Sequence, residues 1–102
     1  MVLPLKGKRQ RSGMVARHCI IKGRVQGVGF RYFTYRAAED HDIKGWVKNL
    51  PGGEVETYAT GDGDAMARFL NELQKGPSSA IVEHVEVRDV ELESYSTFSI
   101  ER

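Results

Sequence analysis

The stretch of this sequence best suited to chemistry runs from Gly23 to Arg31 and reads Gly-Arg-Val-Gln-Gly-Val-Gly-Phe-Arg. Its three glycines allow sharp turns of the backbone and let main-chain N–H groups point inward. A strand-like run precedes the stretch and a helix-like run follows it, and a glycine-rich loop before a helix N-terminus is a common anion site. Arg31 stands where the loop becomes helix, so its guanidinium can add donors suited to a phosphate. The pattern favours a phosphate-binding loop, with a tight structural turn and a solvated arginine as the alternative.

Other residues with reactive side chains fit a site less well. Asn49 is at the end of a predicted strand, and Asn is disfavoured in strands, which favours a functional role for this residue. The alternative is that a strand end simply tolerates Asn. Cys19 precedes Arg24 by one residue too few for the spacing of a phosphatase nucleophile, and we expect it to be a buried core residue. The three histidines are scattered and lack the spacing of metal ligands. The sequence therefore predicts neither a metal site nor a bound cofactor.

Hydrophobic patterns predict the elements that would position these residues. Four segments alternate apolar and polar residues as half-buried strands do: residues 16–24, 43–50, 54–60 and 82–92. The second and third are joined by a Pro-Gly-Gly turn at residues 51–53, which makes a hairpin. Two segments space apolar residues as amphipathic helices do: Phe30, Phe33, Ala37 and Ala38, and then Met66, Phe69, Leu70 and Leu73. Thr34 is expected off the first apolar stripe, and Phe98 and Ile100 suggest a short last strand.

The order strand, helix, strand, strand, helix, strand predicts an α+β ferredoxin-like sandwich, with two helices on one face of an antiparallel sheet. A helical crossover makes the first two strands run in the same direction, so their C-terminal ends lie at one edge of the sheet. The glycine loop leaves one of these ends, and Asn49 lies at the other. The predicted fold therefore brings the loop and Asn49 to the same edge.

Length, composition and charge indicate one small domain. The chain has 102 residues, of which 40% are hydrophobic and 28% charged, and its formal net charge of +1 gives no sign of a nucleic-acid partner. A single cysteine fits a reducing compartment, and no apolar run is long enough to span a bilayer. We expect a cytoplasmic monomer with no nucleic-acid or membrane partner. The four basic residues before Gly13 have no acid among them, so we expect residues 1–14 to be a flexible basic tail and residues 15–102 to be the domain.

Two segments of the sequence resemble the signatures of a known family, the acylphosphatases. The first is Ile21-Lys22-Gly23-Arg24-Val25-Gln26-Gly27-Val28-Gly29-Phe30-Arg31. The second is Gly45-Trp46-Val47-Lys48-Asn49, followed by Gly53, Val55 and Gly61. Two signatures in the expected order and at the expected separation are far more specific than either one alone. The resemblance covers about residues 15–102.

This resemblance implies an enzyme that hydrolyses small-molecule acyl phosphates to a carboxylate and inorganic phosphate, on the same ferredoxin-like fold. It assigns phosphate binding to Arg31 and to the main-chain N–H groups of the loop: Gln26, Gly27, Val28, Gly29 and Phe30. It assigns the attacking water to Asn49. The conjugate acid of a carboxylate leaving group has a pKa of roughly 4, so the group can depart without a general acid. The implied chemistry thus accounts for a sequence that lacks a metal cluster, a nucleophilic cysteine and a His–acid pair.

Two other hypotheses stay open at this point. The chain could be a non-catalytic anion-binding or regulatory domain that has kept the loop, since similar domains occur inside larger proteins, where they assist carbamoyl transfer. It could also be a ferredoxin-like RNA-binding domain with an aromatic platform of Trp46, Tyr58 and His84. The acids on the neighbouring strand positions oppose RNA binding, and no RNA-binding signature occurs in the sequence.

Overall fold

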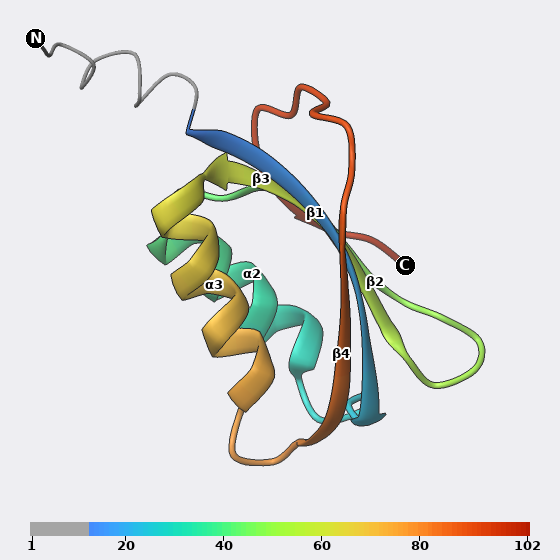
Figure 1. Ribbon diagram of the computed structural model, residues 1–102. Helices are drawn as coiled ribbons and strands as arrows, with labels where there is room; N and C mark the ends of the chain where they lie inside the picture. The colour runs from blue at the N-terminus through green and yellow to red at the C-terminus, as the bar shows by residue number, and fades with distance from the viewer. Residues whose placement is uncertain (1–12) are drawn as a thin grey trace, which may run out of the picture.

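The computed structural model describes residues 13–102 and consists of a five-stranded sheet with two helices packed against one face (Figure 1). The elements follow in this order: β1 (Met14–Arg24), α2 (Phe30–Asp40), β2 (Lys44–Asn49), β3 (Val55–Asp62), α3 (Gly63–Lys75), β4 (Ile81–Asp89) and β5 (Phe98–Ile100). The strands lie side by side in the order β4-β1-β3-β2-β5. This arrangement confirms the predicted α+β ferredoxin-like fold. Of the predicted tail, residues 1–12 lie outside the described residues, and Met14 is the first residue of β1.

The sheet is mixed: the predicted antiparallel pairing is found among the four longer strands, and the short last strand departs from it. β5 pairs in parallel with β2, with Phe98 opposite Gly45 and Ile100 opposite Val47. The reason lies in where the preceding strand ends. β4 finishes beside the start of β1, with Asp89 opposite Arg17, and the chain then crosses that end of the sheet through residues 90–97. It reaches the outer edge of β2 where β2 begins, so it can only run in the direction of β2.

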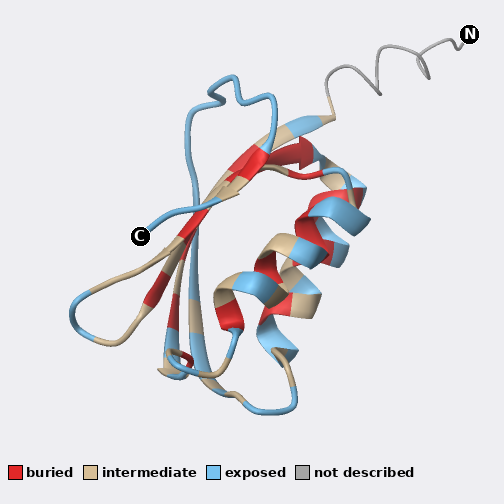
Figure 2. Ribbon diagram, turned by 180° about the vertical axis from the view of Figure 1, so that it is seen from behind, coloured by how far each residue is buried: buried red, intermediate tan, exposed pale blue. Residues whose placement is uncertain are grey.

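The core lies between one face of the sheet and the inner sides of the two helices, where the buried segments of Figure 2 gather. Three of the four apolar positions predicted for α3 are fully buried: Met66, Phe69 and Leu73. In α2 the predicted stripe was wrong at one turn, because Thr34 is buried and Phe33 is only half-buried. The Thr34 hydroxyl donates a hydrogen bond to the carbonyl oxygen of Phe30 at 2.9 Å, so its burial leaves no unpaired polar atom. Neither helix is long and apolar enough to cross a membrane.

The register of the central strands brings two chain segments to one edge of the sheet. β3 is hydrogen-bonded between β1 and β2 and runs antiparallel to both. Val55 on β3 stands opposite Ile21 on one side and opposite Asn49 on the other. β1 continues from Ile21 to Arg24 and then enters the glycine loop, whereas β2 ends at Asn49. The loop and Asn49 therefore leave the same edge of the sheet, as the element order predicted.

Gly45 offers a test of how closely β2 and β3 must approach. Gly45 has a φ of 137°, and a Cβ atom there would lie 1.9 Å from the carbonyl oxygen of Tyr58 on β3. Gly45→Ala must push the two strands apart, and we expect the free energy of unfolding in urea titrations to fall by about 2–4 kcal/mol. Gly52→Ala is the matched control, because the nearest atoms to a Cβ there belong to the flexible Glu54 side chain. Equal stability of the two variants would contradict the prediction.

Candidate active site

A cavity of about 240 Å³ opens at this edge of the sheet, between the β1–α2 loop, the end of β2 and the end of β5. The residues that line it come from all three segments: Val25, Gly27, Gly29, Phe30, Arg31, Tyr32, Asn49 and Ile100. Arg31, Asn49 and both loop glycines therefore share one cavity. Gln26 and Val28, which were also predicted for the site, are not among the lining residues and make other contacts.

The shape of the loop depends on backbone conformations that favour glycine. Gly27 has a φ of 75° and Gly29 a φ of 80°, both in the left-handed region that other residues rarely adopt. A Cβ atom at either position would meet nothing within 4 Å. Glycine is therefore required here by the backbone angle and not by lack of space. The two left-handed turns carry the chain from the end of β1 into the first turn of α2.

Hydrogen bonds tie this loop to its neighbours on both sides. The Gln26 side-chain amide donates to the carbonyl oxygens of Leu50 at 2.7 Å and of Glu54 at 2.8 Å, at the two ends of the β2–β3 turn. The Ser79 hydroxyl, on the segment before β4, donates to the carbonyl oxygen of Val28 at 2.9 Å. Gln26 therefore acts here through its side chain, as an anchor. The contribution of Ser79 could not be found from the sequence, because a serine that bonds a distant main-chain oxygen has no pattern of its own.

The main-chain N–H groups of the loop point to an anion-binding role. Gly29 caps α2 without a side-chain hydrogen bond, and the first turn of α2 carries no acidic residue. The N–H of Phe33 donates to the carbonyl oxygen of Gly29 at 3.0 Å, which is the main-chain bond that starts α2. Unpaired N–H groups at a helix N-terminus carry partial positive charge and attract anions. The loop and the helix start thus offer a set of donors around one wall of the cavity.

The Arg31 guanidinium is held by the end of the chain. Its Nη1 donates a hydrogen bond to the carbonyl oxygen of Glu101 at 2.9 Å. The N–H of Glu101 in turn donates to the carbonyl oxygen of Val47 at 2.8 Å, which extends the pairing of β5 with β2. Within residues 13–102 the other Arg31 donors make no hydrogen bond or ion pair, on a side chain whose position is restrained. Sequence reasoning missed this anchor, because a main-chain acceptor leaves no mark on residue type.

Cys19 and His41 have contacts that explain them without a site. Cys19 is fully buried on the core face of β1, and burial raises the pKa of its thiol to about 12, although Arg17 partly opposes the shift. The thiol is thus neutral at ordinary pH and cannot act as a nucleophile. The expectation that the chain lacks a His–acid pair was wrong, since His41 contacts Glu72 at 2.6 Å between α2 and α3, but neither residue lines the cavity. In residues 13–102 no group of three or more His, Cys, Asp or Glu side chains is arranged to hold a metal ion.

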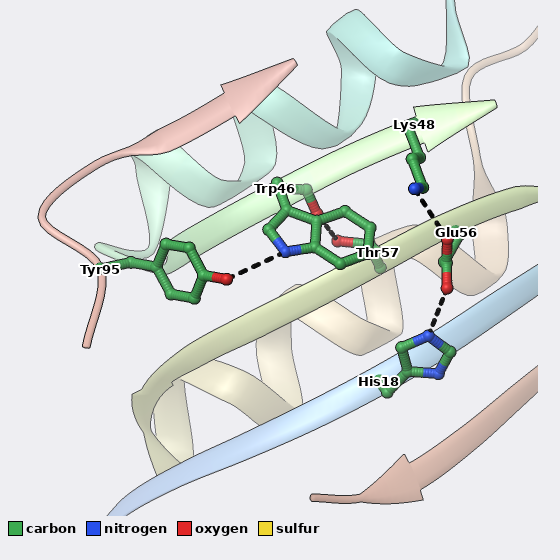
Figure 3. Close-up of polar contacts among 6 residues, drawn as sticks. All are labelled: His18, Trp46, Lys48, Glu56, Thr57 and Tyr95. Carbon is green, nitrogen blue, oxygen red and sulfur yellow. Dashed lines mark hydrogen bonds and ion pairs between the residues drawn. The ribbon is translucent and has the colours of Figure 1, made fainter. Parts of the chain in front are cut away.

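The sheet face away from the helices carries a second group of polar and aromatic side chains (Figure 3). The Trp46 indole N–H donates to the Tyr95 hydroxyl at 3.2 Å, and the Tyr58 ring lies 6.4 Å from the Trp46 ring and 5.4 Å from the Tyr95 ring. The Tyr58 hydroxyl also donates to the carbonyl oxygen of Glu91. These contacts hold the β4–β5 crossover against the sheet. The aromatic residues therefore have a structural explanation, which lends no support to the RNA-binding hypothesis.

An ion-pair row lies on the same face, beside the aromatic group. Glu56 contacts His18 at 2.7 Å and Lys48 at 3.8 Å, so one carboxylate joins three neighbouring strands (Figure 3). The Glu56 carboxylate is therefore paired with cross-strand partners at this position. The row is on the opposite side of β2 from Val47, and none of its three members lines the cavity.

The Gln26 anchor can be tested without changing the loop glycines. Gln26→Met keeps the length of the side chain and removes both donated hydrogen bonds. We expect the free energy of unfolding to fall by about 1–2 kcal/mol and the Kd for inorganic phosphate to rise roughly tenfold, measured by urea titration and calorimetry. Gln74→Met, at an exposed position of α3, is the control and should change neither value. An unchanged phosphate affinity in Gln26→Met would show that the loop keeps its shape without this anchor.

Comparison with known proteins shows which family and which solved structures this chain resembles. The acylphosphatase family profile matches residues 17–100. An acylphosphatase from Archaeoglobus fulgidus is 47% identical over 87 residues, which make up 85% of this chain and 98% of that protein. The structure of an acylphosphatase from Coxiella burnetii matches with a TM-score of 0.86 at 34% identity, covering 91% of this chain and 98% of that one.

A similar fold also occurs as a small part of a longer protein. The structure of full-length HypF in its phosphate- and nucleotide-bound form matches with a TM-score of 0.78 at 30% identity, covering 87% of this chain and 12% of HypF. By contrast, the acylphosphatase relatives are matched over almost their whole length. With the family profile spanning most of the sequence and a full-length relative close to half identical, the chain belongs to the acylphosphatase family.

Proposed function

We propose that this chain hydrolyses acyl phosphates without a metal ion, with Arg31 and the loop N–H groups binding the phosphoryl group and Asn49 positioning the attacking water. The observation that carries the proposal is the shared cavity, which is lined by a guanidinium, a helix N-terminus and a carboxamide. Membership of the acylphosphatase family supports the same reaction.

Charge stabilisation is the main work that the protein does in this scheme. Phosphoryl transfer passes through a loose transition state, whose negative charge spreads over the equatorial oxygens. The N–H groups of Gln26, Gly27, Val28, Gly29 and Phe30 form the predicted cradle for these oxygens. Fixed donors of this kind need no reorganisation during the reaction, which makes them effective catalysts. Arg31 adds a full positive charge and can form bidentate hydrogen bonds to the phosphoryl oxygens.

Asn49 has the properties needed to orient a water molecule. Its carboxamide both donates and accepts hydrogen bonds, so it can hold water in place without acting as a strong base. The water oxygen forms a new bond to phosphorus while the bond from phosphorus to the bridging oxygen breaks. The carboxylate leaves with the electron pair of that bond, and a phosphate oxygen takes the proton of the water. The low pKa of the leaving carboxylic acid, roughly 4, explains why no general acid is required.

The competing hypothesis is a non-catalytic anion-binding domain. The match to a segment of HypF fits such a role, because there the fold is one part of a much longer chain. Two features favour an enzyme instead. Asn49 shares the cavity with Arg31, and full-length relatives named acylphosphatase match nearly the whole domain. We also propose a cytoplasmic monomer, since the one cysteine is a free, buried thiol and the described residues pack around a single core.

Variants at the two key residues separate binding from turnover. Arg31→Ala should lower both phosphate affinity and benzoyl phosphate hydrolysis, the latter on the order of 10²–10³-fold, because it removes the only side-chain cation proposed for the cradle. Asn49→Ala should keep the Kd for inorganic phosphate but lower kcat by a similar factor. Arg68→Ala and Asn71→Ala, on the exposed side of α3, are the matched controls. Full activity of either site variant in a steady-state assay would remove its assigned role.

Independence from metal ions is a separate prediction. The proposed cradle supplies its positive charge from Arg31 and from main-chain dipoles, so no divalent cation is needed to neutralise the phosphoryl group. Dialysis against EDTA should leave kcat/KM for benzoyl phosphate within about twofold of its original value. Strong inhibition that is reversed by adding a divalent metal would show that the catalytic scheme lacks a component.

A further inference from the structure

We propose that Tyr32 and Ile100 form an acyl-binding wall that gives the site a preference for aromatic and bulky apolar acyl phosphates over acetyl phosphate. This inference rests on the proposed function, because it concerns the part of the substrate that is not the phosphoryl group. The two residues line the cavity together with Arg31 and Asn49. They are also among the large apolar side chains of the described residues that remain exposed, at 57% for Tyr32 and 43% for Ile100.

The cavity is divided into a polar part and an apolar part. Its polar groups are Arg31, Asn49 and the loop main chain, all of which are assigned to the phosphoryl group and the water. The rest of the lining is apolar: Val25, Phe30, Tyr32 and Ile100. Val25 and Phe30 are buried in the core, so their surfaces are largely covered by the protein itself. Tyr32 and Ile100 are therefore the apolar side chains that a substrate can cover.

Tyr32 is exposed but held in place by its own helix. Its ring centroid lies 6.1 Å from that of Tyr35, and the Arg36 guanidinium lies 6.0 Å from the ring centroid on the next turn. Arg36 Nη1 also donates to the Tyr32 hydroxyl at 3.4 Å. A ring restrained in this way loses little conformational freedom when a ligand packs against it. A binding surface gains affinity from a ring restrained in this way, whereas a tyrosine that contacts only solvent gains nothing from the restraint.

Ile100 is fixed at the cavity by strand pairing. It stands opposite Val47 in the parallel β2–β5 ladder. Val47 in turn is two residues before Asn49 along β2. The next residue, Glu101, supplies the carbonyl oxygen that holds Arg31. Ile100 is thus adjacent both to the strand that carries Asn49 and to the anchor of Arg31. An acyl group attached to a phosphoryl group bound by Arg31 would be within reach of this side chain.

The cavity is also larger than a phosphoryl group requires. Its volume is about 240 Å³, whereas one molecule of liquid water takes up roughly 30 Å³. A bound phosphoryl group and one attacking water leave part of this space empty. A planar benzoyl group offers more apolar surface than an acetyl group to the Tyr32 ring and the Ile100 side chain, which line the same cavity.

The test compares two substrates in variants of the acyl wall. Steady-state kcat/KM is measured for benzoyl phosphate and acetyl phosphate, and the ratio between them is followed, because a ratio cancels general loss of activity. Tyr32→Ala should lower the benzoyl-to-acetyl ratio about tenfold, mainly through KM, and Ile100→Thr about threefold. Tyr32→Phe should restore the ratio, since it keeps the ring. Ile81→Thr is the matched control, as Ile81 is an equally apolar, 55% exposed residue on β4 outside the cavity.

Two further measurements separate the possible failures. The inhibition constant of inorganic phosphate should be the same in wild type and in the wall variants. If this constant and the KM for benzoyl phosphate rise in parallel, the substitutions have damaged the phosphate cradle, and the inference is overturned. Unchanged ratios in both wall variants would also overturn it. Calorimetric affinities for benzoylphosphonate and acetylphosphonate decide the same question in the absence of turnover. If neither acyl phosphate is hydrolysed but wild type prefers benzoylphosphonate and Tyr32→Ala does not, the proposed function fails and the acyl wall stands.

Discussion

The site depends on one constraint, which is that β3 lies hydrogen-bonded between β1 and β2 in a fixed register. That register places Val55 opposite both Ile21 and Asn49, so the strand that leads to the glycine loop and the strand that ends in the carboxamide finish at the same edge. A slip by one residue would turn Asn49 to the other face of the sheet. Gly45 allows the close approach of β2 to β3, and the buried residues of the two helices cover the resulting face.

In the proposed scheme, the chain builds an anion site on this sheet almost entirely from its backbone. The glycine conformations orient the loop, the uncapped start of α2 contributes its dipole, and a guanidinium completes the set. The side chains nearby serve as supports: Gln26 and Ser79 bond loop-adjacent carbonyls, and the carbonyl oxygen of Glu101 holds Arg31. Supports that satisfy main-chain groups fix geometry without adding competing charge to the cavity, which suits a site that must bind a highly charged group.

Much of the fold and part of the candidate site could be predicted from sequence because their signals are local. Alternating and helical apolar patterns gave the element order, and the glycine loop and Asn49 stand at element ends where residue type is informative. What could not be predicted depends on contacts between distant segments. The parallel direction of β5, the burial of Thr34 and the anchoring roles of Ser79 and Glu101 follow from where other elements lie. Main-chain acceptors in particular impose nothing on residue type, so no pattern in the sequence could reveal them.

In the proposed scheme, the two ends of the substrate are recognised by different kinds of structure. The phosphoryl end meets main-chain donors and one guanidinium, which depend on glycine conformations and on strand register. The acyl end meets two exposed side chains, Tyr32 and Ile100, which contribute little to the core. A substitution at either of these positions can alter the acyl group that fits without disturbing the loop, because neither side chain bonds to it. Chemistry and substrate choice are thus separable in this fold, since the first is fixed by backbone geometry and the second by side chains at the rim of the cavity.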